Sequence, residues 1–282
     1  MPSSPSSSVQ AAREAVAARL RELMMEAGLR GHELAARCGW NAAKTSRIIN
    51  AKTQPSDADI RAWCAACGAD DQAADLVASA RAVDFMYVEW RRLQRNGLRK
   101  VQEDFYALHE QSALCRVYVS NVMPGFFQTA PYATAVLQAV TRFWATPDDV
   151  VEAVASRVAR SRFLYEGRHR FAVVMEEWVL RSRIGDVETM AGQLRHLLAV
   201  LPLASVSLGV IPSTASRTLW PMEAFYLYDD RRAVVETLTA EINVTQPREI
   251  ADYARAFADL AKMAVYGDEA KARINAAIDS LG

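Results

Sequence analysis

The sequence predicts a mainly α-helical protein in two parts: an all-helical N-terminal domain, then an α+β domain of long helices with a small, mostly antiparallel sheet. Apolar residues recur at three- and four-residue steps over residues 9–27, as an amphipathic helix requires. Short apolar runs at 171–175 and 206–211 indicate buried strands. Two further runs, 225–228 and 233–238, flank an Asp-Asp pair as the strands of a hairpin do.

Composition limits the class of protein. The 282 residues are 51% hydrophobic, and 33 Lys and Arg balance 33 Asp and Glu, which excludes a uniformly basic chain but allows a local basic face. Four cysteines (Cys38, Cys64, Cys67 and Cys115) do not form a secreted disulfide framework, so a reduced, cytoplasmic protein is expected. No apolar run is long enough to span a membrane, and the Ser- and Pro-rich residues 1–8 are expected to be a disordered leader.

Residues 28–55, GLRGHELAARCGWNAAKTSRIINAKTQP, predict two short helices joined by a turn at Gly39. Asn41 is a natural N-cap for the second helix, since its side-chain oxygen can accept from the free N–H groups of the first turn. The spacing assigns the buried side to five residues, Leu34, Ala35, Thr45, Ile48 and Ile49. This arrangement predicts a helix-turn-helix, whose second helix enters the major groove of DNA.

Two more helices are expected before residue 80, one capped by Ser56 and ended by Gly68, and one starting at Asp70 and Asp71. Five short helices over residues 9–80 resemble the lambda-repressor-like fold of the xenobiotic-response-element (Xre) regulators. The matching residues are Leu29, Glu33, Leu34, Ala35, Gly39, Trp40, Ser46, Arg47, Ile48, Asn50, Pro55 and Ser56. The family usually carries Ser or Thr followed by Gln where this chain has Arg30 and Gly31, so Arg30 is expected to replace a phosphate contact.

The predicted DNA contacts follow from position on the second helix. Ala42, Ala43 and Arg47 are expected to face the groove, and Asn41, Lys44 and Asn50 to lie near the phosphate backbone. Arg47 is the residue expected to read bases, because its guanidinium can donate two hydrogen bonds to guanine. Lys44 and Lys52 are expected to neutralise phosphates.

The second predicted domain covers residues 81–282. Within it, residues 122–137 predict an apolar elbow joining two helices, with a turn at Pro124 and Gly125 and a helix capped by Thr129. In order, the strings at 124–133, 173–185, 185–198 and 207–216 resemble the C-terminal domain of actinobacterial WhiJ-like regulators. That resemblance implies a DNA-binding repressor or antitoxin-like regulator, often encoded beside a small protein partner.

Seven residues of this domain are candidates for a small-molecule pocket or a partner groove, with an ordinary core as the alternative for the aromatic ones: Phe126, Phe127, Tyr132, Trp144, Trp178, Trp220 and Glu177. Glu177 is expected to pair with an arginine such as Arg157 or Arg181. Cys64 and Cys67 are interpreted as core fillers, because no second Cys or His pair has matching spacing. No nucleotide-binding loop, zinc-protease motif or nucleophile elbow occurs, so no enzyme, metal or cofactor is predicted.

These observations predict a dimeric, sequence-specific transcriptional regulator that binds an inverted-repeat operator in double-stranded DNA. Two alternatives stay open. One is an antitoxin-like module that sequesters a small protein encoded by a neighbouring gene and regulates its own synthesis. The other is a repressor that responds to a small molecule, which would require an aromatic-lined cavity with convergent polar groups in the second domain.

Overall fold

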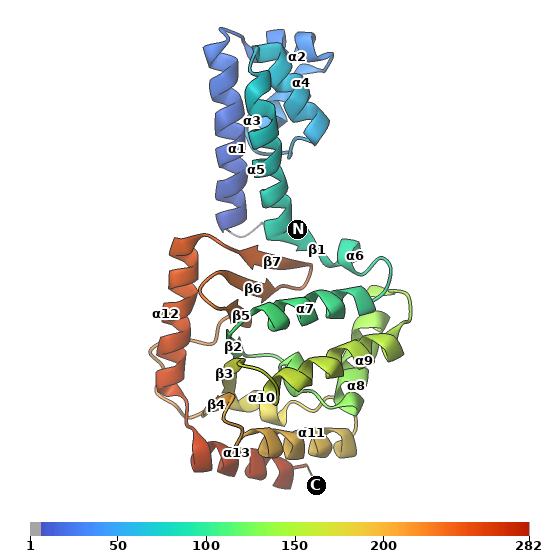
Figure 1. Ribbon diagram of the computed structural model, residues 1–282, viewed down its shortest axis with the longest axis vertical. Coiled ribbons are helices and arrows are strands. Elements are labelled where there is room, and N and C mark those ends of the chain that lie inside the picture. The colour runs from blue at the N-terminus through green and yellow to red at the C-terminus, as the bar shows by residue number, and fades with distance from the viewer. Residues whose placement is uncertain (1–6, 282) are drawn as a thin grey trace. The chain divides into compact units, whose positions relative to one another are not determined.

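A computed structural model describes residues 7–281, which form two compact units, Met1–Val88 and Glu89–Gly282. We call them the N-terminal and the C-terminal unit and describe each by itself (Figure 1). Residues 1–6 of the expected leader lie outside the described residues, and the first helix begins at Ser7. The predicted fold class, mainly helical with an all-helical part followed by an α+β part, is confirmed.

Over residues 7–86, the N-terminal unit is built of helices. They are α1 (Ser7–Glu26), α2 (Gly31–Cys38), α3 (Ala42–Ile49), α4 (Asp57–Cys67), the 3-10 turn η1 (Asp70–Gln72) and α5 (Ala73–Met86). Gly39 and Gly68 end α2 and α4 in the left-handed conformation that glycine adopts without steric cost. Trp63 is fully buried at the centre of the core, where its indole N–H donates to the Leu20 carbonyl at 2.9 Å.

The C-terminal unit alternates helices and strands. Its helices and 3-10 turns are α6 (Trp90–Leu93), α7 (Arg99–Gln111), η2 (Gly125–Phe127), α8 (Ala130–Trp144), α9 (Val150–Ala159), η3 (Arg160–Leu164), α10 (Glu177–Arg181), α11 (Val187–Val200), α12 (Pro247–Met263) and α13 (Gly267–Asp279). The strands are β1 (Tyr87–Glu89, at the boundary of the units), β2 (Leu114–Val119), β3 (Arg170–Glu176), β4 (Val206–Ile211), β5 (Phe225–Tyr228), β6 (Arg232–Glu236) and β7 (Ala240–Val244).

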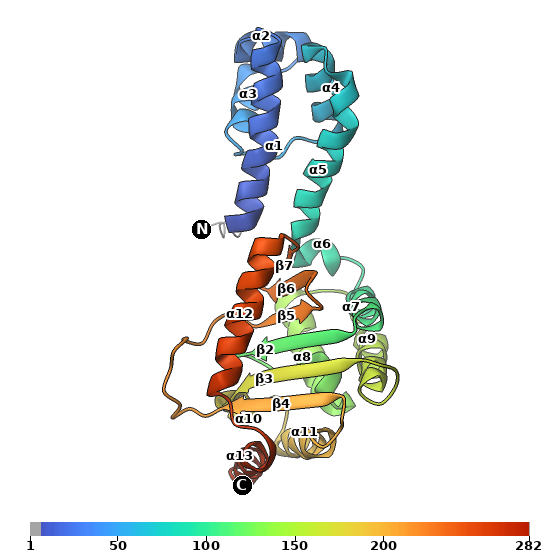
Figure 2. The ribbon, with the colours of Figure 1, turned by 60° about the vertical axis from the view of Figure 1, so that its left-hand side comes forward.

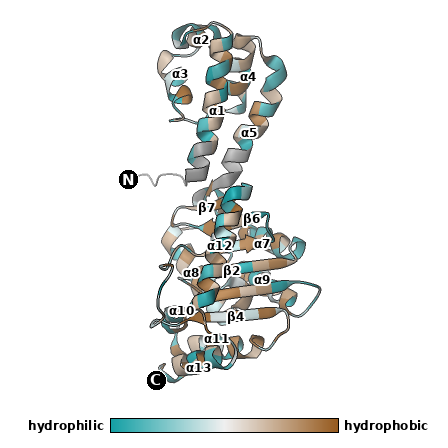
Figure 3. Ribbon diagram, turned by 90° about the vertical axis from the view of Figure 1, so that its left-hand side faces the viewer, coloured by the Kyte–Doolittle hydropathy of each residue, from teal (hydrophilic) through white to brown (hydrophobic). Residues whose placement is uncertain are grey.

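The sheet has the order β1-β7-β6-β5-β2-β3-β4. β2, β3 and β4 pair in parallel, whereas β2 with β5, β5 with β6 and β6 with β7 are antiparallel. Helix α12 crosses one face and α7, α8 and α9 lie on the other (Figure 2). The strands carry many of the unit's apolar residues, drawn in brown in Figure 3, because both faces are covered by helices.

Two features of the structure differ from the sequence prediction for this unit: its strands and the connection that follows β2. β1, β2 and β7 were not predicted, although β2 lies centrally and its residue Val117 pairs with Val173 on one side and Tyr226 on the other. Residues 120–129, which include the 3-10 turn η2, connect strand β2 to helix α8. The expected elbow therefore joins a strand to a helix and not two helices. After residue 247 the chain forms two helices, α12 and α13, separated at Val265, which forms a bridge with Val210 of β4.

Candidate nucleic-acid interface

Helix α3 is closed at both ends by side chains of its own flanking residues. The Asn41 side-chain oxygen accepts from the Lys44 N–H at 2.9 Å, which confirms the predicted N-cap. At the other end, the Asn50 amide donates to the Ser46 carbonyl at 2.8 Å. These bonds satisfy backbone groups that a helix of eight residues otherwise leaves free, so α3 keeps its shape on the surface.

The inner side of α3 is fixed by packing against α1 and α2. Thr45 and Ile48 are each 1% exposed and Leu34 of α2 is fully buried, while Ile49 is partly buried against the same core. The buried side predicted from residue spacing is therefore confirmed. Arg21 of α1 adds a polar link, since its guanidinium donates to the Ile49 carbonyl at 2.5 Å, where the helix dipole favours a cation.

The outer side of α3 presents Ala42, Ala43, Ser46 and Arg47, all exposed. Among the described residues, no side-chain hydrogen bond or ion pair engages Arg47, so its guanidinium donors remain available. Ser46 was not among the predicted contacts. The signal was present, since Ser46 follows Ala42 and Ala43 by four and three residues and thus lies on the same face of a helix.

Lys44 is held within the unit, whereas the sequence prediction left it free for DNA. Its ammonium lies 2.6 Å from the Asp59 carboxylate and 4.3 Å from the centre of the Trp40 ring. Asp59 belongs to the first turn of α4, where it also accepts from the Ser56 N–H at 3.1 Å. Burial would raise the pKa of Asp59, but the bonds from Lys44 and Ser56 outweigh it and lower that pKa. Lys44 thus joins α3 to α4.

The other predicted phosphate contacts lie at helix ends. Arg30 precedes α2, and its backbone N–H donates to the Glu33 carboxylate at 2.7 Å. The Arg30 side chain is exposed and has no hydrogen-bond or ion-pair partner among the described residues. Lys52 follows α3 and is exposed; its N–H donates to the Arg47 carbonyl at 2.9 Å. Both side chains can reach outward from this unit.

The seven candidates of the C-terminal unit do not form one site. Phe126, Phe127 and Tyr132 are at most 1% exposed and belong to the core, so no ligand or partner can reach them. Trp178 and Trp220 lie on the surface, 47% and 68% exposed. Trp144 lines a cavity of this unit.

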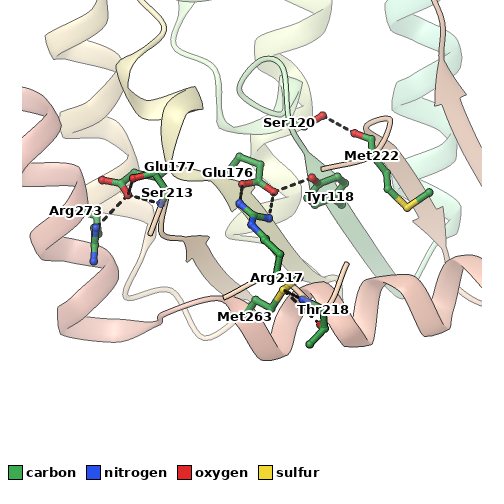
Figure 4. A network of polar contacts seen from close by, with 10 residues as sticks. All are labelled: Tyr118, Ser120, Glu176, Glu177, Ser213, Arg217, Thr218, Met222, Met263 and Arg273. Atoms are coloured by element: carbon green, nitrogen blue, oxygen red, sulfur yellow. Dashed lines mark hydrogen bonds and ion pairs between the residues drawn. The ribbon is translucent and has the colours of Figure 1, made fainter. Parts of the chain in front are cut away.

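Glu177, the seventh candidate, is held by an ion-pair cluster at the end of β3 (Figure 4). Its carboxylate lies 3.0 Å from Arg273 and 3.4 Å from Arg181, and it accepts from the Ser213 N–H at 2.8 Å. The predicted pairing with Arg181 is therefore observed, whereas Arg157 donates to Gln102 and Gln128 instead.

The neighbouring Glu176 forms a separate cluster, since its buried carboxylate accepts from the Tyr118 hydroxyl at 2.8 Å and from Arg217 at 2.8 and 2.5 Å (Figure 4). Both carboxylates are thus occupied by structural partners.

Three cysteines of the N-terminal unit are free thiols. Burial raises the pKa of Cys64, and it raises that of Cys67 to about 11, so neither is a ready thiolate. In the part of the chain that the structure describes, no group of three or more His, Cys, Asp or Glu residues could hold a metal ion. Over the same residues, no helix combines the length and apolar character needed to cross a membrane.

A capped, outward-facing α3 packed on α2 defines a helix-turn-helix protein, and residues 15–77 match the family described as "Helix-turn-helix domain". Residues 102–276, more than half of the chain, match the "Domain of unknown function (DUF5753)", and the protein belongs to that family.

Comparison with curated proteins finds no match. A solved structure, titled as that of the archaeal chromatin protein TrmBL2 with a novel mode of DNA binding, is similar over 85% of this chain and 88% of that chain, with a TM-score of 0.30 and 11% sequence identity. We draw no conclusion from so low a TM-score.

Proposed function

We propose that this protein is a transcriptional regulator that binds specific sequences in double-stranded DNA, with α3 as the recognition helix. The observation that supports it best is the outer side of α3, a helix capped at both ends. There, small residues lie beside Arg47, whose side chain has no partner among the described residues. Small side chains let a helix approach base edges closely, and an arginine can donate two hydrogen bonds to guanine O6 and N7.

The roles of the individual residues follow from their positions. Arg47 reads a guanine, Ser46 donates to or accepts from a neighbouring base, and Ala42 and Ala43 contact thymine methyl groups. Asn41 and Asn50, at the two ends of α3, lie beside the phosphate backbone, as do Arg30 and Lys52. Lys44 contacts a phosphate only when its ion pair with Asp59 is broken.

The protein acts as a homodimer on an inverted repeat. A single unit of this size covers too little DNA for strong specificity, whereas a two-fold axis places two recognition helices about one helical turn apart. The resemblance to Xre and actinobacterial WhiJ-like regulators supports the same assignment and leaves to the C-terminal unit the role of controlling DNA binding.

The experiment that tests this function is selection of DNA sites from a random duplex pool with the full-length protein at physiological salt. We expect an enriched motif with two symmetric half-sites, each containing guanine. Recovery of unenriched DNA would contradict sequence-specific binding, and an enriched motif without symmetry would contradict the dimer.

A second candidate function is capture of a small protein encoded by a neighbouring gene, as in antitoxin-like regulators. The exposed Trp178 and Trp220 favour it, because large exposed aromatic residues commonly anchor protein interfaces. Copurification of the neighbouring gene product should weaken in Trp178→Ala or Trp220→Ala, with Phe143→Ala, at a third exposed aromatic residue, as the control. Unchanged copurification in both tryptophan variants would contradict this candidate.

A further inference from the structure

The C-terminal unit contains a cavity of about 390 Å³ among α6, α7, α8, α9 and the residues that follow β6. This volume lies within the range of small-molecule sites in proteins. The cavity is partly open to solvent, so a ligand can enter without unfolding the unit. A larger and more open hollow of about 660 Å³ around residues 164–170 and 203–205 has, among the described residues, Tyr165 and His169 as its only aromatic lining residues.

Three aromatic side chains line the cavity: Trp90, Phe105 and Trp144. Trp90 is fixed in place, because its indole N–H donates to the Thr237 carbonyl at 2.9 Å. An aromatic wall held in this way stacks well on a flat or bulky apolar group.

A buried polar group in the cavity is left unsatisfied. Gln94 is only 6% exposed, and among the described residues its side-chain oxygen has no hydrogen-bond partner. A buried acceptor without a partner costs free energy, and a ligand donor would remove this cost. This observation points to an occupant with hydrogen-bonding groups as well as an apolar body.

The cavity also contains a cation prepared for an anion. Arg157 donates from Nε to the Gln102 oxygen at 2.9 Å and from Nη1 to the Gln128 oxygen at 3.0 Å, while its Nη2 bonds to no described residue. Arg160 donates to the same Gln102 oxygen at 2.9 Å. Two guanidinium groups this close repel each other, so an anion at Arg157 would be stabilised.

An acid lies in the same cavity. Glu236, at the end of β6, lines it together with Arg157, yet the two form no ion pair among the described residues. The two charges attract each other without direct contact, and this arrangement is complementary to a ligand that carries both charges and lies between them.

We propose that this cavity binds a small amphoteric aromatic molecule with the chemistry of an aromatic amino acid. Its carboxylate pairs with Arg157, its ammonium group pairs with Glu236, and its ring lies against Trp90, Phe105 and Trp144. The proposal goes beyond DNA binding and does not depend on it.

The test is calorimetric titration of the full-length protein, without DNA, with three matched probes. L-phenylalanine carries both charges, N-acetyl-L-phenylalanine lacks the cation, and L-phenylalaninamide lacks the carboxylate. We expect L-phenylalanine to bind, and each of the other two to bind at least about tenfold more weakly, since each loses one charge-assisted contact.

Variants assign each contact. Glu236→Gln should remove the preference for L-phenylalanine over its N-acetyl form, and Arg157→Gln should remove the preference over the amide. Trp144→Ala should weaken L-phenylalanine binding, while Trp178→Ala, on α10 and outside the cavity, should not. Because Arg157 holds two buried amides, the folding of its variant is checked by circular dichroism, and Glu236→Gln provides an independent test.

Absence of binding by all three probes up to their solubility limits would overturn the proposal. Equal affinity of the three probes would overturn the charge assignment, as would equal weakening of L-phenylalanine and N-acetyl-L-phenylalanine by Glu236→Gln. None of these results bears on DNA binding, which is measured separately.

Discussion

Substitution of Lys44 and of Arg47, two cations three residues apart on α3, should affect different properties: the stability of the N-terminal unit in the first case and DNA recognition in the second. Lys44 is 36% exposed and Asp59 17%, so their ion pair is partly screened and contributes about 0.5–1 kcal/mol. The contact of Lys44 with the Trp40 ring adds about 0.5–1 kcal/mol. Lys44→Ala should therefore destabilise the N-terminal unit by about 1–2 kcal/mol. Arg47→Ala removes an exposed side chain that no other described residue binds, so it should change the stability by less than about 0.5 kcal/mol.

Amide hydrogen exchange of α3 and α4 measures this difference locally. In Lys44→Ala we expect protection to fall about 5- to 30-fold, the factor that corresponds to 1–2 kcal/mol. Arg47→Ala should leave protection unchanged and weaken binding to a selected DNA site by about 1–3 kcal/mol, with a smaller effect on random DNA. Unchanged protection in Lys44→Ala, with a loss of DNA affinity equal to that of Arg47→Ala, would refute these roles.

Three further predictions concern glycine positions, acid stability and salt. Gly97→Ala should destabilise the C-terminal unit by about 2 kcal/mol or more, because Gly97 has φ +101° and an added Cβ would lie 2.3 Å from the Asp149 carboxylate. Gly192→Ala, in α11, should stabilise the unit by about 0.5–1 kcal/mol, because an added Cβ would meet no atom within 4 Å. Urea unfolding of the two variants and wild type measures both effects. Burial would raise the pKa of Glu177, but its hydrogen bonds and Arg273 outweigh burial and lower the pKa below the ordinary 4.5, so the ionised carboxylate stabilises the folded state at neutral pH and this stabilisation is lost as the pH falls through the lowered pKa. The difference in free energy of unfolding between wild type and Glu177→Gln should therefore narrow below about pH 4.5. A difference that stays constant with pH would contradict this. Lys52→Ala should reduce the slope of log affinity for DNA against log salt concentration by about one ion. An unchanged slope would show that Lys52 does not contact a phosphate.

The N-terminal unit could be predicted closely from the sequence because its signals are local. The N-cap Asn41, the stop at Gly39 and the buried Thr45 and Ile48 depend on residues a few positions apart. The ion pair of Lys44 was not predicted, because its partner Asp59 lies fifteen residues away on another helix. Sequence spacing shows which face a side chain occupies, but not which tertiary partner engages it.

In the C-terminal unit, β3, β4 and the β5–β6 hairpin were predicted, since they are apolar runs or flank a turn. Among the missed strands, β2 includes Arg116, which breaks the apolar run. The structure accommodates Arg116 through hydrogen bonds to the Asp229 carbonyl and the Asp230 carboxylate.

The candidate ligand-binding residues were the part predicted least accurately from the sequence, because a string of aromatic residues does not show whether they lie in the core or on the surface. Phe126 and Phe127 are core, whereas the cavity residues Gln94, Arg157 and Glu236 come from segments up to 142 positions apart and share no sequence signal.

The most direct test of the central claim is the ratio of affinities for a selected site and for a scrambled duplex of the same composition, measured by fluorescence anisotropy at physiological salt. For the full-length protein we expect a ratio of about 1,000 or more, as is typical of specific DNA-binding proteins, and a lower ratio in Arg47→Ala. A ratio near one, or a ratio that Arg47→Ala leaves unchanged, would contradict the assignment of α3 as the recognition helix.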